Sequence, residues 1–158
     1  GYPGNDDDGR TLQAGLDPAK LRTDMVNSAR HLKAHAMSSG KLGVTGFCWG
    51  GGTTNFLAAT LGADMHAGVP FYGAAADTAT VPAIKAPLMI QYAENDERIN
   101  AMWPAYEAAL KAAGVNHEMR MYPGAQHGFH NNSTPRHHEA SAKLAWERTI
   151  AFFNKHLA

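Results

Sequence analysis

The strongest constraint on how this chain folds is a short stretch in which a glycine-flanked cysteine follows an apolar run. Residues 42–47 are compatible with a β-strand, residues 46–50 read Gly-Phe-Cys-Trp-Gly, and a small-residue, helix-like segment comes next. A Gly-x-nucleophile-x-Gly sequence between a strand and a helix predicts a tight turn that projects the central side chain above the sheet. Glycine is expected on both sides because the two backbones pass too closely for a Cβ atom. The single cysteine, Cys48, is therefore a candidate nucleophile.

The predicted position of Cys48 also bears on its reactivity. A thiol just before a helix N-terminus faces free N–H groups and a positive dipole, which favour the thiolate and lower the thiol pKa. The backbone N–H of Trp49 would point at the oxyanion that forms when the thiolate attacks a carbonyl. The alternative is that Cys48 is a small buried apolar residue with no chemical role, as lone cysteines commonly are.

Composition narrows the possible classes of function. A chain of 158 residues suits a single domain, residues 1–158. Fourteen basic and fourteen acidic residues give a formal net charge of zero, so charge gives no reason to expect nucleic acid or a membrane surface as a partner. One cysteine forms no internal disulfide, and no apolar run is long enough to cross a bilayer. No signal peptide is recognisable, and the sequence does not define a cellular location.

The N-terminal part of the chain is expected to contain one helix. Residues 1–15 are rich in Gly, Asp and Asn and predict a loop-like lead-in. Asp17-Pro18 is typical of a helix start, with an acidic N-cap followed by proline at the first helical position. Apolar residues then recur at steps of three or four and predict one buried helix face, with Gly40 as a stop. These residues are Leu21, Met25, Ala29, Leu32 and Ala36.

The rest of the chain is expected to alternate between strands and helices. Strands are predicted at residues 42–47, 67–73, 87–93 and 117–122, and helices at 50–62, 100–113 and from 135 to the C-terminal end. The continuously apolar run 87–93 is the clearest strand, whereas Pro70 weakens the prediction for 67–73. The apolar face of the last helix is expected at Trp146, Ile150, Phe153 and Leu157. This order predicts an α/β fold with a mainly parallel sheet of about four strands flanked by helices.

Three side chains with complementary chemistry follow three different predicted strands. Cys48 follows the first strand, Asp96 the third and His127 the fourth. We expect them to meet, because ligands of parallel sheets bind beyond the C-terminal ends of the strands. Near neutral pH an imidazole can take the proton of a thiol, and a carboxylate can fix its tautomer and stabilise its cation. The chain order of nucleophile, acid and histidine is that of α/β-hydrolases.

Two of these three assignments have rivals within a few residues. Asp96 is flanked by Glu94 and Glu97, and is preferred because a short side chain in a turn past the strand can point across the sheet. His127 is preferred for its tight loop directly after a strand. Its rivals are His130, His137 and His138. A metal site is the weaker hypothesis, because the histidine spacing lacks the Glu of zincin motifs and a cysteine partner. Neither a metal nor another cofactor is expected.

The same residues resemble the dienelactone hydrolase family of α/β-hydrolases. The similarity covers roughly residues 41–158, and its matching segments are 46–51, 71–73, 94–96, 124–129, 145–149 and 152–153. The cysteine is the specific part, since most α/β-hydrolases have serine at this position. The resemblance implies a truncated α/β-hydrolase fold and a Cys–His–Asp triad that opens a lactone or cleaves an ester through an acyl-enzyme.

In that scheme each candidate residue has one role. Cys48 would attack the carbonyl, and the Trp49 N–H would help to hold the oxyanion. His127 would protonate the leaving alkoxide and then activate water, while Asp96 orients the imidazole. The resemblance further implies that four side chains line the substrate pocket, namely Tyr72, Arg98, Trp103 and Phe129.

Two departures from the family pattern affect these expectations. Family members carry several N-terminal strands, with a glutamate that regulates the cysteine and a loop that gives the second oxyanion donor, and residues 1–15 offer no counterpart. One edge of the sheet would then be exposed, and we expect a homo-oligomer that covers it. The family's substrate-binding arginine after the histidine is also unmatched. Residues 130–132 read His-Asn-Asn there, and Arg136 is the nearest candidate.

The leading hypothesis is a carboxylic ester hydrolase that acts on short-chain esters or lactones. One alternative is a true dienelactone hydrolase, that is, a carboxymethylenebutenolidase. The alternative from another class is a non-catalytic α/β fragment or assembly module. The expected partner in the first two cases is a small-molecule ester or lactone.

Overall fold

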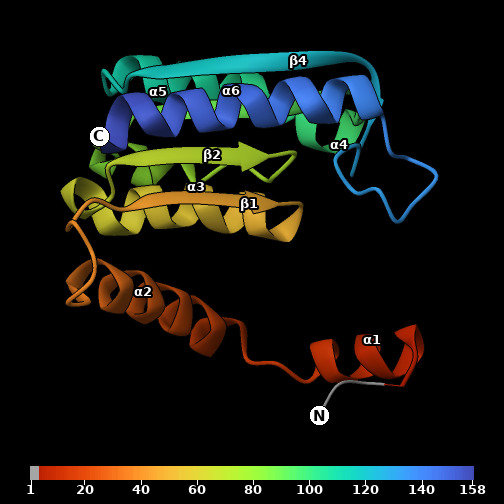
Figure 1. Ribbon diagram of the computed structural model, residues 1–158, viewed down its shortest axis with the longest axis horizontal. Coiled ribbons are helices and arrows are strands. Elements are labelled where there is room, and N and C mark those ends of the chain that lie inside the picture. Colours follow the sequence, from red (N-terminus) through yellow and green to blue (C-terminus); the bar gives the residue numbers. More distant parts are fainter. Residues whose placement is uncertain (1–3) are drawn as a thin grey trace.

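A computed structural model describes residues 4–158 (Figure 1). Its helices are α1 (Asp6–Ala14), α2 (Pro18–Ala34), α3 (Trp49–Leu61), α4 (Glu97–Asn100), α5 (Trp103–Ala112) and α6 (Glu139–Leu157). Its strands are β1 (Gly43–Phe47), β2 (Ala67–Phe71), β3 (Leu88–Asn95) and β4 (His117–Gln126). There are also two short 3-10 helices in the described residues. The first, η1 (Gly62–Asp64), follows α3, and the second, η2 (Thr78–Ala83), lies between β2 and β3.

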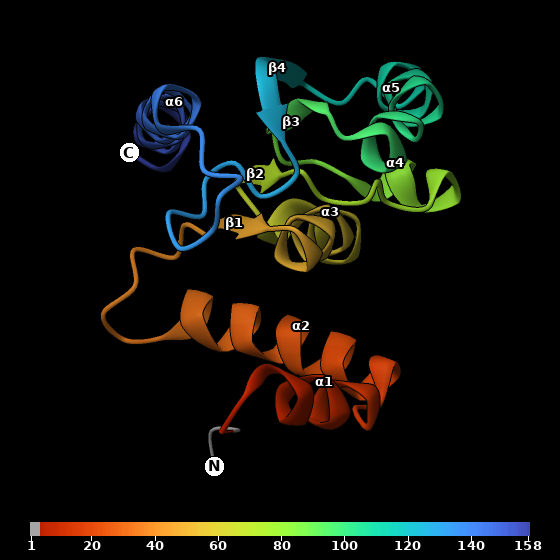
Figure 2. The same cartoon turned by 90° about the vertical axis from the view of Figure 1, so that its right-hand side faces the viewer.

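The four strands form one sheet in the order β1-β2-β3-β4, and every neighbouring pair is parallel. Figure 2 shows helix α6 on one face of this sheet and helices α3 and α5 on the other. This arrangement confirms the predicted parallel sheet of about four strands flanked by helices. The C-terminal ends of all four strands consequently lie at the same end of the sheet.

The two central strands, β2 and β3, are buried on both faces of the sheet, which explains why β3 is so uniformly apolar. Leu88, Ile90 and Tyr92 point into the core shared with α3 and α5, and each is fully buried. Met89 and Ala93, which alternate with them, belong to the core beneath α6. Strand β3, which the sequence predicts most clearly, therefore contributes side chains to both cores.

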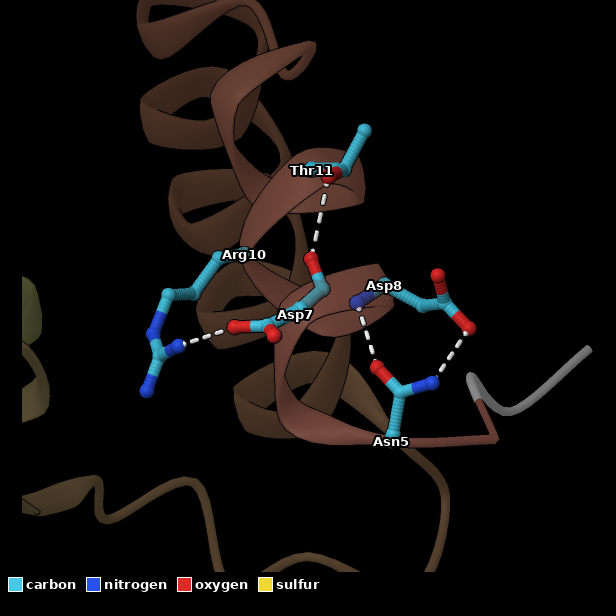
Figure 3. A network of polar contacts seen from close by, with 5 residues as sticks. All are labelled: Asn5, Asp7, Asp8, Arg10 and Thr11. Carbon is cyan, nitrogen blue, oxygen red and sulfur yellow. Dashed lines mark hydrogen bonds and ion pairs between the residues drawn. The ribbon is translucent and has the colours of Figure 1, made fainter.

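The prediction of a loop-like lead-in is wrong for residues 6–14, which form helix α1 (Figure 3). Asn5 caps this helix by accepting a hydrogen bond from the Asp8 N–H at 2.9 Å. Asp6, Asp7 and Asp8 form the first helical turn, where their negative charge interacts favourably with the positive end of the helix dipole. No residue of α1 is buried, so local bonds stabilise it, including that from Thr11 Oγ1 to the Asp7 carbonyl. Residues 1–3 of the predicted lead-in lie outside the described residues.

Helix α2 begins as predicted, with the Asp17 carboxylate accepting from the Ala19 N–H at 2.8 Å. The predicted apolar face is only partly buried, because α2 packs on α3 and leaves most of its own surface in solvent. Val26 and Ala29 are buried, whereas Leu32 is 60% exposed. The helix also ends at Ala34, before the predicted stop at Gly40.

The last helix starts later and buries a different face from the predicted one. His138 caps α6, so residues 135–137 precede the helix. Its buried residues are Ser141, Ala142, Ala145, Thr149 and Phe152, while Trp146 and Ile150 are each 43% exposed. The face is rotated because Gln91, buried in β3, donates hydrogen bonds to the Ala145 carbonyl and the Thr149 hydroxyl. The spacing of apolar residues along the helix does not indicate such a buried polar contact, so it does not predict this face.

Strand β1 forms one edge of the sheet and β4 the other. Beside β1 lies a shallow hollow of about 580 Å³. Its lining residues are Phe47, His130, Asn132, His137, Glu139, Ala142, Lys143 and Trp146. The homo-oligomer expected at this edge stays a prediction, which the molecular mass in solution, measured by light scattering, would test. Within residues 4–158, no helix combines the length and apolar character that crossing a membrane requires.

Candidate active site

Cys48 stands on a strained turn between β1 and α3, with a φ of 54°. This turn is as crowded as predicted at Gly46, where an added Cβ would lie 2.2 Å from the Gly50 carbonyl oxygen. Crowding does not require glycine at position 50, contrary to the prediction, because a Cβ there would meet no described atom within 4 Å. Instead, Gly51 and Gly73 make the second close approach, with a Cβ on Gly73 only 2.2 Å from the Gly51 carbonyl carbon. Helix α3 thus packs directly on backbone atoms at two places beside the cysteine.

Substitution of the two glycines beside Cys48 is expected to have opposite outcomes. Gly46→Ala should destabilise the protein by about 3 kcal/mol, because its methyl group meets backbone atoms that no rotamer change can move. Gly50→Ala, the matched control, should be neutral or stabilise by up to about 1 kcal/mol, since alanine favours a helix. Urea unfolding monitored by circular dichroism measures both free energies. Equal unfolding free energies for the two variants would contradict this account of the turn.

The structure brings Asp96 and His127 together. The imidazole Nδ1 of His127 lies 2.6 Å from Oδ2 of Asp96, and Asp96 is only 7% exposed. The other carboxylate oxygen accepts from the Ile99 N–H at 3.4 Å, because Asp96 is the N-cap of α4. An ionised carboxylate can accept hydrogen bonds but cannot donate one. The imidazole Nδ1 therefore carries the proton in its hydrogen bond to Asp96. The opposite ring nitrogen, Nε2, is then available to take a proton from a nucleophile.

The rival acids and histidines have other partners. Glu94 accepts a hydrogen bond from the Gly124 N–H at 2.8 Å, and Glu97 is exposed on α4. The His130 ring packs beside the β1 edge, with centroids 5.0 Å from Phe47 and 5.7 Å from Trp146. Partial burial lowers the pKa of His130. Of the remaining rivals, His138 caps α6 and His137 lies in the hollow beside β1.

Cys48 and His127 line one pocket of about 540 Å³ at the C-terminal end of the sheet. Trp49, Tyr72 and Arg98 line it as well. As the first residue of α3, Trp49 has a backbone N–H with no partner inside the helix. Tyr72 has a φ of 36°, and its ring centroid lies 5.1 Å from that of His127.

Two side chains expected in the pocket lie elsewhere. Trp103 packs edge-on against Tyr92 and Tyr106, at 5.8 and 6.3 Å between ring centroids, because α5 turns it into the core. Phe129 is fully buried beneath the site, where its ring centroid is 5.3 Å from that of Tyr72. It therefore supports a pocket residue and does not line the pocket.

Several residues that line the pocket carry no signal in the sequence. Arg22 reaches the pocket from α2, with its guanidinium 5.3 Å from the ring centroid of Phe56, which also lines the pocket. The segment after β2 supplies the rest of this wall, at Ala74, Ala75, Ala76, Asp77 and Thr80. No motif marks these residues, because helix α2 and the loop reach the pocket only through tertiary packing. No group of three His, Cys, Asp or Glu side chains suited to a metal ion occurs within residues 4–158.

The pKa of the Cys48 thiol is raised above its ordinary value, so the prediction of a lowered pKa is wrong in direction. Partial burial of the thiol is the largest effect, and the carboxylate of Asp96 acts in the same sense. The guanidinium groups of Arg136 and Arg98 lower the thiol pKa, but by less than burial and Asp96 together raise it. Among the hydrogen bonds of the described residues, none joins the Cys48 thiol to His127. A raised pKa favours the neutral form of this thiol at neutral pH.

Alkylation of Cys48 by iodoacetamide should follow this raised pKa. Only the thiolate reacts, so the alkylation rate should still be rising at pH 8. We expect it to reach half its maximum at a pH above the ordinary thiol pKa of about 8.5, because the pKa of Cys48 is raised. Mass spectrometry of the Cys48 peptide, sampled over time at several pH values, measures the rate. A rate already at its plateau below about pH 7 would show a stabilised thiolate and contradict the raised pKa.

The fold and the site together define an α/β-hydrolase with cysteine at the nucleophile position of the turn. The chain belongs to the dienelactone hydrolase family, whose sequence profile matches residues 4–157. The match confirms the resemblance described for residues 41–158 and extends it towards the N-terminus.

Individual relatives agree with this assignment. A Salmonella typhi protein named "Putative carboxymethylenebutenolidase" is 30% identical over 168 residues, which cover 97% of this chain and 62% of that protein. A crystal structure from Klebsiella pneumoniae, described as a "Putative Dienelactone Hydrolase", has a TM-score of 0.81 at 27% identity, covering 98% of this chain and 69% of that one. The dienelactone hydrolase of Anabaena variabilis shares the fold, with a TM-score of 0.74 at 20% identity, covering 96% and 68%. The chain spans less than two thirds of the length of the curated relative.

Proposed function

We propose that this protein is a carboxylic ester hydrolase that transfers an acyl group from short-chain esters or lactones to Cys48 and then to water. The observation that carries the proposal is the 2.6 Å hydrogen bond between His127 and Asp96 at a pocket that Cys48 also lines. This arrangement supports a base that can accept the thiol proton and hold it as a stabilised cation. Family membership supports the same class of reaction.

The proposed acylation step begins with the neutral thiol. As Sγ of Cys48 forms a bond to the substrate carbonyl carbon, its proton passes to Nε2 of His127. The carbonyl oxygen becomes an oxyanion, to which the Trp49 N–H would donate a hydrogen bond. Collapse of this intermediate breaks the bond to the alcohol oxygen, which takes the proton from His127. The products of this half are the alcohol and a thioester on Cys48.

The second half reaction repeats the proton transfers with water. His127 takes a proton from a water molecule as its oxygen attacks the thioester carbonyl. Collapse of the second oxyanion breaks the carbon–sulfur bond, releases the carboxylic acid, and returns the proton to the thiol. Asp96 keeps its hydrogen bond to Nδ1 throughout and stabilises the imidazolium in both halves.

The lining of the pocket bears on which substrates it would accept. Phe56 and the alanines at 74–76 offer apolar surface for a short acyl chain. Arg22 and Arg98 line the same pocket and would favour a substrate that also carries a negative charge. This pair of cations supports the second candidate function, hydrolysis of a lactone carboxylate such as a dienelactone.

Steady-state hydrolysis separates these possibilities. We expect the chain to hydrolyse p-nitrophenyl acetate and butyrate with a burst of nitrophenol, and iodoacetamide to abolish the activity. A dienelactone with kcat/KM at least about 100-fold above both esters would favour the second candidate, since that ratio reflects differential transition-state binding. A folded chain that hydrolyses none of these substrates would contradict both candidates and favour a non-catalytic module.

A further inference from the structure

The β3–β4 ladder is irregular at the end that carries the site. Ala93 pairs with Tyr122, but the next recorded pair is Asn95 with Gln126. Glu94 of β3 therefore faces a three-residue stretch of β4, residues 123–125, which leaves β4 two residues longer at this point. Pro123 and Gly124 lie in this irregularity, and the strand continues past its predicted end at residue 122 to Gln126.

The two extra residues explain why Asp96 and His127 meet. These two residues directly follow the paired residues Asn95 and Gln126. Without the irregularity, His127 would lie two positions further along, a displacement of about 7 Å at the usual strand rise. The local path of β4 is thus a condition for the 2.6 Å bond between Nδ1 and Oδ2.

Two side chains bond backbone groups at the irregularity. Gly124, with a φ of 70°, donates its N–H to the Glu94 carboxylate at 2.8 Å. Asn100 Nδ2 donates to the carbonyls of Ala93 and Glu94 at 2.9 and 3.1 Å. Its own Oδ1 is buried and has no hydrogen-bond partner within residues 4–158, so the two carbonyls orient the side chain. Asn100 therefore holds the β3 side of the irregularity, and Glu94 is bonded to the β4 side.

We propose that Glu94 is a positioning residue for the Asp96–His127 pair. Its carboxylate fixes Gly124, three residues before His127, and so holds the extra residues of β4 in the path that brings the imidazole to Asp96. Glu94 is exposed and does not line the pocket, so it acts without touching the thiol or a substrate. Its effect on rate rests on the proposed function, whereas its effect on the hydrogen bond does not.

The test compares Glu94→Ala with Glu94→Gln, whose amide oxygen can still accept from the Gly124 N–H. The direct readout is the proton NMR resonance of the His127 Nδ1–H, which a short bond to a carboxylate moves far downfield and which His127→Ala would identify. We expect Glu94→Ala to lose or broaden this resonance and Glu94→Gln to keep it. Glu97→Ala is the matched control, because it removes an exposed acid on α4 and should leave the resonance unchanged.

Kinetics provides the second readout. For p-nitrophenyl acetate we expect Glu94→Ala to lower kcat by about 10-fold, because a small displacement of a catalytic group is costly, and to change KM by less than about twofold. Glu94→Gln should stay within about threefold of the unmodified enzyme, as expected if the bond to Gly124 matters and the charge does not. If Glu94→Ala does not fold, Glu94→Asp, which is too short to reach Gly124, replaces it.

The outcomes separate this proposal from the proposed function. A Glu94→Ala variant with an unchanged resonance would overturn the positioning role, whatever the activity. Loss of the resonance in both Glu94 variants would also overturn it, because the bond to Gly124 would not be the cause. If the unmodified chain is inactive but only Glu94→Ala loses the resonance, the positioning role holds and the proposed function fails.

Discussion

Replacing Cys48 with Ala is expected to lower kcat for p-nitrophenyl acetate by at least about 10⁴-fold, because no other group can form the thioester. The Cys48 side chain makes no capping hydrogen bond to α3, so the fold should not depend on its sulfur. Alanine at a φ of 54° is no more strained than cysteine, since both carry a Cβ. If the melting temperature is unchanged, the loss of kcat is therefore due to the missing thiol and not to a change in the fold.

Cys48→Ser is the matched control for this experiment. Serine keeps the shape and a proton that His127 can take, but its hydroxyl is a weaker nucleophile than a thiol. We expect its kcat to fall between those of the unmodified enzyme and Cys48→Ala. Stopped-flow and steady-state assays on the three proteins give the comparison. A kcat for Cys48→Ala within about tenfold of the unmodified value would show that another group carries the reaction.

Replacing His127 with Ala is expected to cost nearly as much, about 10³- to 10⁵-fold in kcat at neutral pH. The thiol pKa is raised, so without the imidazole almost no thiolate forms and the leaving alkoxide has no acid. In the proposed mechanism Cys48 and His127 act as one unit, so the double variant should be no slower than Cys48→Ala alone. The measurement is kcat for the two single variants and the double variant.

His138→Ala is the control for that second experiment. His138 accepts from the Ser141 N–H at the start of α6, so its loss should lower the free energy of unfolding by about 1 kcal/mol and leave kcat unchanged. Effects of His127→Ala and Cys48→Ala that simply multiply in the double variant would contradict a shared mechanism.

The parts of the site that the sequence predicts are those fixed by local backbone geometry. The turn at Cys48 needs Gly46 because of atoms four residues away, so its pattern is short enough to read directly. The sequence predicts that Asp96 and His127 meet, because parallel strands end at a common edge. The bond between them depends, however, on the irregular path of β4, and no alternation in residues 117–126 indicates that path.

The remaining errors arise from tertiary packing. Trp103 follows α5 into the core against Tyr92, and a helical pattern alone does not say what it faces. The buried face of α6 is set by Gln91, which is distant in sequence. The thiol pKa depends on how burial balances the charges of Arg136 and Asp96, and only three-dimensional positions decide that balance.

The most direct test of the proposed mechanism is the intact mass of the protein after a rapid acid quench during p-nitrophenyl acetate turnover. We predict one added acetyl group, mapped by peptide fragmentation to Cys48, and no such group on Cys48→Ala. Hydrolysis without any acetylated cysteine, or an equal acetyl group on Cys48→Ala, would contradict acyl transfer through this thiol.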